Sequence, residues 1–387
     1  MNSSFRSLYL LDPSVIFLNH GSFGACPIPV FETYQNWQRE LERQPVEFLG
    51  RRINGLLAES REILGRFLNI SGDDLVFFPN PTTAINMVVR SLKLEPGDEV
   101  LASNHEYGAM DRTWRFICKL SGAQYINHKI PLPVHDPEAF IAQFISGISP
   151  KTKVIFLSHI TSPTALIFPI EEIVKIARQS GILTIIDGAH APGQITLNLK
   201  SIGADIYTGA LHKWLGAPKG SAFLYVRKDL QDIFEPLVVS WGYESETHGK
   251  SRFIDYHEWQ GTRDLAAFLS VPAAIAFQEQ HGWHSIRADC HNLATQARRR
   301  INYITGLESI CPEGNIWFSQ MCAIRVPKLG NNHYQPRLYE NYRIEIPVIQ
   351  WQGDTFLRLS VQGYNQETDI DLLVRAVGEL LDASHVH

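Results

Sequence analysis

The sequence predicts an α/β fold with a mostly parallel sheet, followed by a smaller α+β region. Between residues 74 and 227, short runs rich in Val, Ile, Leu and Phe alternate with helical stretches. Strands that are apolar along nearly their whole length are typical of parallel sheets, because helices cover such sheets on both faces. After about residue 270 the alternation ends, and a long helical stretch precedes several strand-like runs.

Each element follows from its own pattern. Apolar residues recur at helical spacing over 55–69, which predicts a helix. Strands are predicted at 74–79, 99–104, 123–130, 153–160, 182–187, 206–211 and 221–227. Helices are predicted between them at 82–92, 110–122, 137–148 and 170–181. The C-terminal region is predicted to hold a helical stretch at 264–306, strand-like runs at 321–327, 343–350 and 355–361, a long surface loop at 328–336 and a helix at 367–381.

The length of 387 residues fits two domains, at roughly 150 residues for each domain. We place an N-terminal segment at 1–45, a large domain at 46–270 and a small C-terminal domain at 271–387. Only 19% of the residues are charged, which leads us to expect a surface buried between subunits.

Composition excludes several classes of partner. With 35 basic and 40 acidic residues the net charge is -5, so we expect neither a nucleic acid nor a membrane surface as partner. No run approaches about 18 apolar residues, and the first residues lack a signal-peptide core. Five cysteines without CxxC spacing predict neither a disulfide framework nor a structural metal site. A cytoplasmic location is expected.

The strongest local signal is Lys213, which lies between a strand-like run and a turn rich in Gly and Pro. A lysine in a desolvated pocket is neutral more often, and its amine can form a Schiff base with an aldehyde. Taken alone, this segment is equally compatible with a solvated loop lysine.

Asp187 ends an apolar strand 26 positions before this lysine. Ligands of open α/β sheets bind at the carboxyl ends of strands, although such an Asp is more often a helix cap or a turn residue. A pyridoxal phosphate site needs a lysine for the aldehyde and an acid that keeps the ring nitrogen protonated. The pair therefore predicts pyridoxal 5′-phosphate as cofactor.

The segment NPTTAIN, residues 80–86, lies between the first strand and its helix. Free N–H groups and hydroxyls at the start of a helix can hold a phosphate. A plain threonine N-cap is the alternative reading of this junction.

Several segments resemble the fold-type-I pyridoxal-phosphate enzymes of aminotransferase class V, and within them the isopenicillin N epimerase-like branch. The resemblance extends in the family's order from about Phe17 to near the C-terminus. It implies a seven-stranded-type sheet between helices, a small α+β domain and an N-terminal segment that contributes to the active site. The segments are FLNHGSFGACP, NPTTAIN, SHITSPTALIFPI, IIDGAHAPGQ, YTGALHKWLGAPKG, WQGTRD and LRLSVQGYNQETDIDLL.

The resemblance implies roles for individual cofactor-binding residues. Lys213 would bind the cofactor aldehyde, Asp187 would pair with the pyridine nitrogen, and Tyr107 would stack on the ring, so that these three are the expected catalytic residues. His190 would approach the phenolic oxygen. The phosphate would be held by Thr82, Thr83 and His212, and by Gly261 and Thr262 of a neighbouring subunit in a homodimer.

On the substrate side, the resemblance assigns Arg358 to the α-carboxylate of an amino acid, while Asn19 and His20 would line the site. A planar guanidinium suits bidentate binding of a carboxylate.

The resemblance leaves the reaction open between epimerisation, C–S lyase chemistry and transamination, because all three use Lys213, Asp187 and Arg358. A persulfide-forming desulfurase needs a mobile cysteine ahead of the arginine, and residues 328–340 contain none. Epimerisation by two bases would need a proton donor opposite Lys213, for which Tyr107 or His20 could serve. A pyridoxal-phosphate-binding module without turnover is the alternative of another class.

Overall fold

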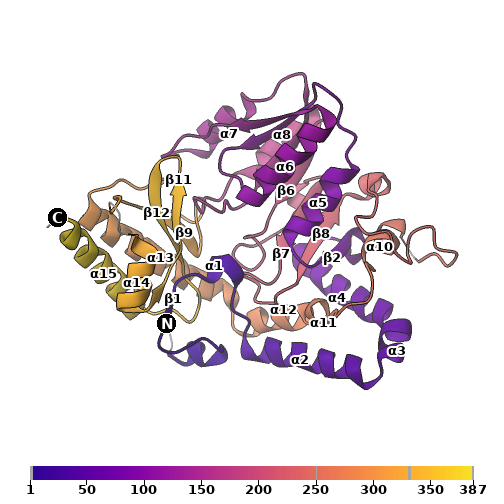
Figure 1. The fold of residues 1–387 in the computed structure, drawn as a ribbon, viewed down its shortest axis with the longest axis horizontal. Coiled ribbons are helices and arrows are strands. Elements are labelled where there is room, and N and C mark those ends of the chain that lie inside the picture. The colour runs from indigo at the N-terminus through magenta and orange to yellow at the C-terminus, as the bar shows by residue number, and fades with distance from the viewer. Residues whose placement is uncertain (1–2, 250, 330–332, 386–387) are drawn as a thin grey trace.

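The computed structural model describes residues 3–249, 251–329 and 333–385, and its largest sheet has seven strands. Helices surround this sheet (Figure 1). The strand order is β2-β8-β7-β6-β5-β3-β4, and β8 alone runs antiparallel to its neighbours, β2 and β7. The predicted α/β class with a mostly parallel sheet is confirmed. The strands are β2 (Leu75–Phe78), β3 (Glu99–Ser103), β4 (Gln124–His128), β5 (Thr152–Ser158), β6 (Leu183–Asp187), β7 (Ile206–Ala210) and β8 (Ala222–Val226).

Helices pack on both faces of this sheet, and each face has its own apolar core. Alternate residues of β2 show the division: Phe77 belongs to one core, whereas Phe78 belongs to the other. Helices α5 and α6 contribute to the core of Phe78, and α4, α7 and α8 contribute to the core of Phe77. These helices are α4 (Ile53–Leu68), α5 (Pro81–Ser91), α6 (Gly108–Ser121), α7 (Pro137–Ile145), α8 (Ile170–Gln179), α9 (Leu199–Ile202) and α10 (Arg252–His257).

A second, antiparallel sheet has the strand order β11-β12-β9 and lies beside the first (Figure 1). Helix α13 packs against β9 and against α15. The strands are β9 (Met321–Val326), β10 (Ile344–Glu345), β11 (Val348–Trp351) and β12 (Asp354–Ser360). The helices are α11 (Ala266–Leu269), α12 (Val271–Gln280), α13 (Trp283–Thr305), α14 (Tyr334–Tyr342) and α15 (Glu367–His385).

The N-terminal segment connects both regions. Its short strand β1 (Ile16–Phe17) pairs in parallel with β10, and helix α2 (Ile28–Arg43) packs on α11 and α12. Helices α1 (His20–Phe23) and α3 (Pro45–Glu47) flank α2. The domain boundaries at 45/46 and 270/271 stay a prediction.

The surface loop predicted at 328–336 is wrong at its C-terminal end. Residues 330–332 lie outside the described residues, but α14 begins at Tyr334, so the last three residues form the first turn of a helix. Proline is tolerated in a first turn, which removes the objection to a helix at Pro336. Tyr334 and Leu338 are both buried, and their spacing of four residues puts them on one helix face.

The carboxyl ends of the parallel strands meet at one edge of the large sheet. Strands β5, β6 and β7 end there in Ser158, Asp187 and Ala210, and the loops after β6 and β7 carry the predicted site residues His190, His212 and Lys213. Within the described part of the chain, no helix has the length and apolar character needed to cross a membrane.

Candidate active site

A pocket of about 180 Å³ lies at this edge of the sheet. It brings together residues that are more than 100 positions apart in the chain. Six of the predicted site residues line it: Thr82, Tyr107, Asp187, His190, His212 and Lys213.

Lys213 follows β7 and points its amine at His190. The Nζ atom lies 3.2 Å from Nε2 of His190. Burial and, to a smaller extent, the charge of Arg358 lower the pKa of Lys213 to about 8, whereas the charge of Asp187 opposes this shift. A lysine with such a pKa has a substantial neutral fraction near neutral pH, as a nucleophilic amine requires.

Asp187 is the last residue of β6 and is buried. Burial raises the pKa of its carboxyl group above the usual range, while the N–H of Ala189, 2.9 Å from Oδ1, and the charge of Lys213 lower it. An added cationic N–H group in the pocket would stabilise the ionised carboxylate further.

The start of helix α5 supplies free donors to the pocket. Asn80 is the N-cap, and its Oδ1 accepts hydrogen bonds from the N–H of Thr83 at 2.8 Å and from the Thr83 hydroxyl at 3.1 Å. The threonine N-cap considered from sequence is therefore wrong, because Asn80 has that place. Thr82 lines the pocket, whereas Thr83 does not.

His212 also lines the pocket. Its Nδ1 lies 2.9 Å from the carbonyl oxygen of Ser221, so the N–H of Nδ1 donates to that carbonyl. Burial lowers the pKa of His212 to about 4. A bound phosphate would reverse this shift, because a nearby anion favours the charged imidazole.

Arg358 does not line the pocket but holds two of its walls. Its Nη1 donates to the carbonyl oxygen of Ser162 at 2.8 Å and to Oγ of Ser162 at 3.0 Å, and its Nη2 donates to Oγ of Ser22 at 2.8 Å. Burial lowers the pKa of the guanidinium to about 10, and its Nε has no hydrogen-bond partner among the described residues. A buried cation without a carboxylate partner is suited to bind an anion.

The remaining predicted site residues have different positions. Tyr107 lines the pocket as the residue before α6, with 47% of its surface exposed. His20 is buried outside the pocket wall, and its ring nitrogens lie 3.0 Å from the hydroxyl of Tyr364 and 3.1 Å from the carbonyl oxygen of Lys213. Burial lowers the pKa of His20 to about 3. The geometry gives His20 a structural role and does not favour its use as a second base.

Asn19 is also buried outside the pocket wall, and its Nδ2 donates to Oε1 of Glu345 at 3.0 Å. Gly261 and Thr262 follow α10, and neither lines the pocket of its own chain. Their expected contact with a neighbouring subunit stays a prediction.

Glu106 is a buried carboxyl group that the sequence analysis missed. Its Oε2 accepts hydrogen bonds from the N–H of Ser158 at 2.8 Å and from its hydroxyl at 2.6 Å, and Oε1 accepts from Ser103. Burial raises the pKa of Glu106 to about 8, although the serine hydrogen bonds lower it. Ser158 pairs with Asp187 in the sheet, so Glu106 binds the strand next to the one that carries Asp187, and the charge of Asp187 also raises the pKa of Glu106.

Ser22 and Ser162 were also missed as individual residues. Both line the pocket and both accept hydrogen bonds from Arg358. In the sequence, Ser22 lies in a segment rich in glycine and Ser162 follows a predicted strand. Neither property distinguishes a serine of the site from other serines.

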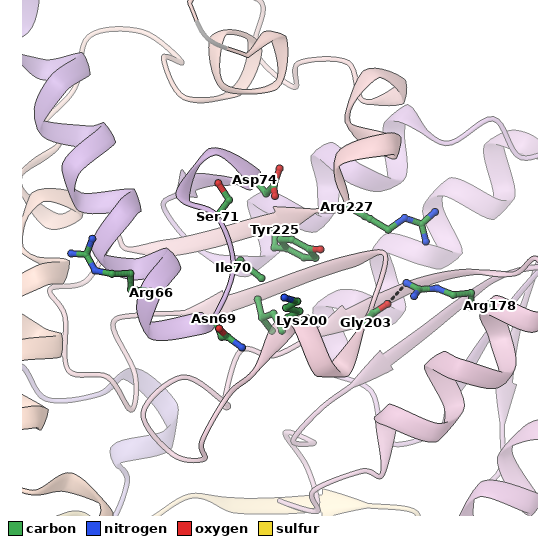
Figure 2. A pocket seen from close by; sticks show the side chains of 11 residues that line it. Arg66, Asn69, Ile70, Ser71, Asp74, Arg178, Lys200, Gly203, Tyr225 and Arg227 are labelled. Atoms are coloured by element: carbon green, nitrogen blue, oxygen red, sulfur yellow. Dashed lines mark hydrogen bonds between the residues drawn. The ribbon is translucent and has the colours of Figure 1, made fainter.

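A larger, more open depression of about 640 Å³ lies elsewhere on the large sheet, where strands β6 and β7 begin (Figure 2). Its arginines already have partners: Arg178 donates to the carbonyl of Gly203, and Arg227 pairs with Asp205 and Asp229. None of the predicted site residues lines it. The smaller pocket is therefore the candidate active site.

The family model for aminotransferase class V matches residues 29–373 of the chain. The chain belongs to the aminotransferase class V family. Within the described residues, no group of three or more His, Cys, Asp or Glu side chains is arranged to hold a metal ion.

Proteins similar to this chain are named for different reactions. The chain is 35% identical to a protein named isopenicillin N epimerase from Streptomyces clavuligerus, with 97% of each chain covered. It is 29% identical to a probable L-cysteine desulfhydrase, chloroplastic, from Arabidopsis thaliana, over 96% of this chain and 84% of that protein. A solved structure of a C-DES mutant, with glycine covalently linked to its PLP cofactor, has a TM-score of 0.83 at 21% identity and covers 97% of this chain and 99% of that one.

Pyridoxal 5′-phosphate is the cofactor of this class V enzyme. The donor set of the pocket fits it. Lys213 offers an amine of lowered pKa, Asp187 offers a buried carboxyl group, and Thr82 offers a hydroxyl at the start of α5. Lys213, Asp187 and Thr82 line the pocket, and we propose that they would hold the aldehyde, the ring nitrogen and the phosphate.

Proposed function

We propose that the protein is a pyridoxal-phosphate-dependent epimerase, which inverts the α-carbon of an amino acid. The observation that carries this proposal is the arrangement around one pocket: Lys213 and Asp187 line it, while Arg358 donates to Ser162 and Ser22 in its walls. The 35% identity to a protein named isopenicillin N epimerase, over 97% of both chains, supports the reaction type.

Bound pyridoxal phosphate supplies an electron sink, which makes the α-proton of an attached amino acid acidic. Arg358 binds the substrate carboxylate in place of its serine partners and thereby fixes the α-carbon. Lys213, with its pKa of about 8, takes or returns the α-proton on its own side. Inversion needs a second donor, and Tyr107 is our candidate because its side chain is half-exposed at the pocket wall.

A C–S lyase is the second candidate function. Elimination of a sulfur substituent needs only one base, which Lys213 can supply. The burial of His20 and its contact with Tyr364 remove this histidine as a second base, which an epimerase would need. Similarity to a probable L-cysteine desulfhydrase supports this alternative. Among the described residues no cysteine lines the pocket, so we do not propose the persulfide type of desulfurase.

The test is to incubate the purified holoenzyme with single enantiomers of amino acids in deuterated buffer. For an epimerase we expect deuterium at the α-carbon together with the opposite enantiomer, read by NMR and chiral chromatography. Tyr107→Phe is expected to keep the α-carbon exchange but to lose inversion, since Lys213 remains. Release of pyruvate and sulfide from L-cysteine, without inversion at the α-carbon of any amino acid tested, would overturn the proposal of an epimerase and favour a C–S lyase.

We further propose that the active unit is a homodimer, in which Gly261 and Thr262 complete the partner's phosphate site. Exposed apolar side chains in the preceding loop support a subunit contact there, among them Val239 at 68% and Trp241 at 86% exposure. Mixing subunits that carry Lys213→Ala with subunits that carry Thr262→Ala tests this. Restored activity in the mixture supports shared sites, whereas a monomer by light scattering with full activity contradicts them.

A further inference from the structure

Two adjacent residues bind opposite sides of the His190 ring. Nζ of Lys213 lies 3.2 Å from Nε2, and Nε1 of Trp214 donates to Nδ1 at a distance of 3.3 Å. An indole N–H can only donate, so Nδ1 of His190 must accept and cannot carry a proton. The tautomer of His190 is thus assigned from its partners.

The charge state of His190 completes this assignment. Burial lowers its pKa well below the usual value, and the nearby cations Lys213 and Arg358 lower it further, so the ring is neutral. A neutral imidazole carries one proton, which must then lie on Nε2. The N–H of Nε2 faces Nζ of Lys213, and this contact is a hydrogen bond only when the amine accepts it in its neutral form.

Trp214 is itself held firmly. It has no exposed surface, and its carbonyl oxygen accepts a hydrogen bond from Nε2 of Gln278 at 2.8 Å. Gly193 packs so closely on its backbone that an added Cβ would lie 2.5 Å from the carbonyl oxygen of Trp214. The indole N–H therefore stays directed at His190.

We propose that Trp214 is a positioning residue: its indole N–H holds His190 in the tautomer that presents the N–H of Nε2 to the reacting amine of Lys213. This favours the neutral amine, which is the form that attacks the cofactor aldehyde. The proposal concerns loading of the cofactor and holds for an epimerase and for a lyase alike, so failure of either proposed reaction leaves it standing.

Trp214→Phe tests it, because phenylalanine keeps an aromatic ring and removes the donor. In the variant, the proton of His190 can move to Nδ1, and Nε2 can then accept a hydrogen bond from protonated Lys213. The pKa of Lys213 should rise. We expect the pH midpoint for the rate of pyridoxal phosphate binding to cofactor-stripped enzyme to move upward by about one unit. Nitrogen-15 NMR of labelled histidine should show the change of tautomer.

Two further variants separate positioning from packing. In His190→Leu the side chain has neither a donor nor an acceptor, so adding Trp214→Phe to it should leave the midpoint where it is. Trp114→Phe removes another buried indole, whose Nε1 has no hydrogen-bond partner among the described residues, and should not change the midpoint. An unchanged midpoint in Trp214→Phe, or a wild-type signal with the proton on Nδ1, would overturn the proposal. Equal shifts caused by Trp214→Phe with and without His190→Leu would also overturn it.

Discussion

Arg358 donates two hydrogen bonds to Ser162, at 2.8 Å to the carbonyl oxygen and 3.0 Å to Oγ, although 196 residues separate them. Arg358 belongs to β12 of the small sheet, whereas Ser162 follows β5 of the large one. The contact joins the two sheets at the wall of the pocket. A substrate carboxylate bound by the guanidinium of Arg358 would replace its hydrogen bonds to Ser162. Because those hydrogen bonds join the two sheets, substrate binding is linked to the relative position of the sheets.

Arg358→Lys should weaken substrate binding. An ammonium group cannot give two parallel hydrogen bonds to a carboxylate, and lost charged hydrogen bonds of this kind reduce kcat/KM by about 10–100-fold. Arg325→Lys is the matched control, since Arg325 lies on the neighbouring strand β9 and pairs with Asp354 at 3.1 Å. Steady-state kinetics on both variants measure the difference. Equal losses in both would mean that Arg358 acts through fold stability.

Lys213→Ala should abolish covalent attachment of the cofactor. Borohydride reduction followed by mass spectrometry should find no label on the variant, and turnover should fall by more than about 10³-fold. Lys219→Ala is the control, because Lys219 lies six positions further on and its Nζ donates to the carbonyl of Gly24 at 3.0 Å. Label retained on the Lys213 variant would assign the attachment to another lysine.

Thr82→Val should weaken cofactor binding more than Thr83→Val. The Thr82 side chain borders the pocket, whereas the Thr83 hydroxyl is already bonded to Asn80 at 3.1 Å. We expect the Kd for pyridoxal phosphate to rise about 10-fold for Thr82→Val, as for loss of one hydrogen bond to a charged group. Fluorescence titration measures it. The opposite order would show that phosphate binding displaces the Asn80 cap.

Glu106→Gln should stabilise the protein at alkaline pH. Because burial raises the folded-state pKa of Glu106 from 4.5 to about 8, its contribution to stability is fully present below pH 4.5 and is lost as the pH rises toward 8. Glutamine stays neutral, can accept from Ser158 and can donate to Ser103. Denaturant unfolding should give the variant an advantage of about 1–3 kcal/mol at pH 8.5.

At pH 4.5 this advantage should be absent. Glu59→Gln, which changes an exposed carboxyl group, should show no such pH dependence. A constant difference between the Glu106 variant and wild type across pH would mean that the carboxyl group of Glu106 is ionised in the folded protein.

Much of the fold followed from local pattern. Each predicted strand of the large sheet is present, because alternation of apolar strands and helices reflects burial on both faces. Helix α14 was missed as a whole: its first turn was predicted as loop, because Pro336 and the neighbouring polar residues resemble one, and residues 337–342 were assigned no element. Lys213 and Asp187 were found because Lys213 follows a predicted strand and Asp187 ends one. The carboxyl ends of parallel strands lie at the same edge of a sheet, where ligands bind.

The sequence by itself determined the class of the protein, since the spacing of strands, helices and strand-end groups is a local property of the chain. The tertiary structure alone decided that Arg358 contacts Ser162, that His20 contacts the hydroxyl of Tyr364, and that burial raises the pKa of Glu106. These facts depend on which distant segments exclude water from one another, because burial sets both the hydrogen-bond partners and the pKa of a group. No periodicity along the chain encodes that.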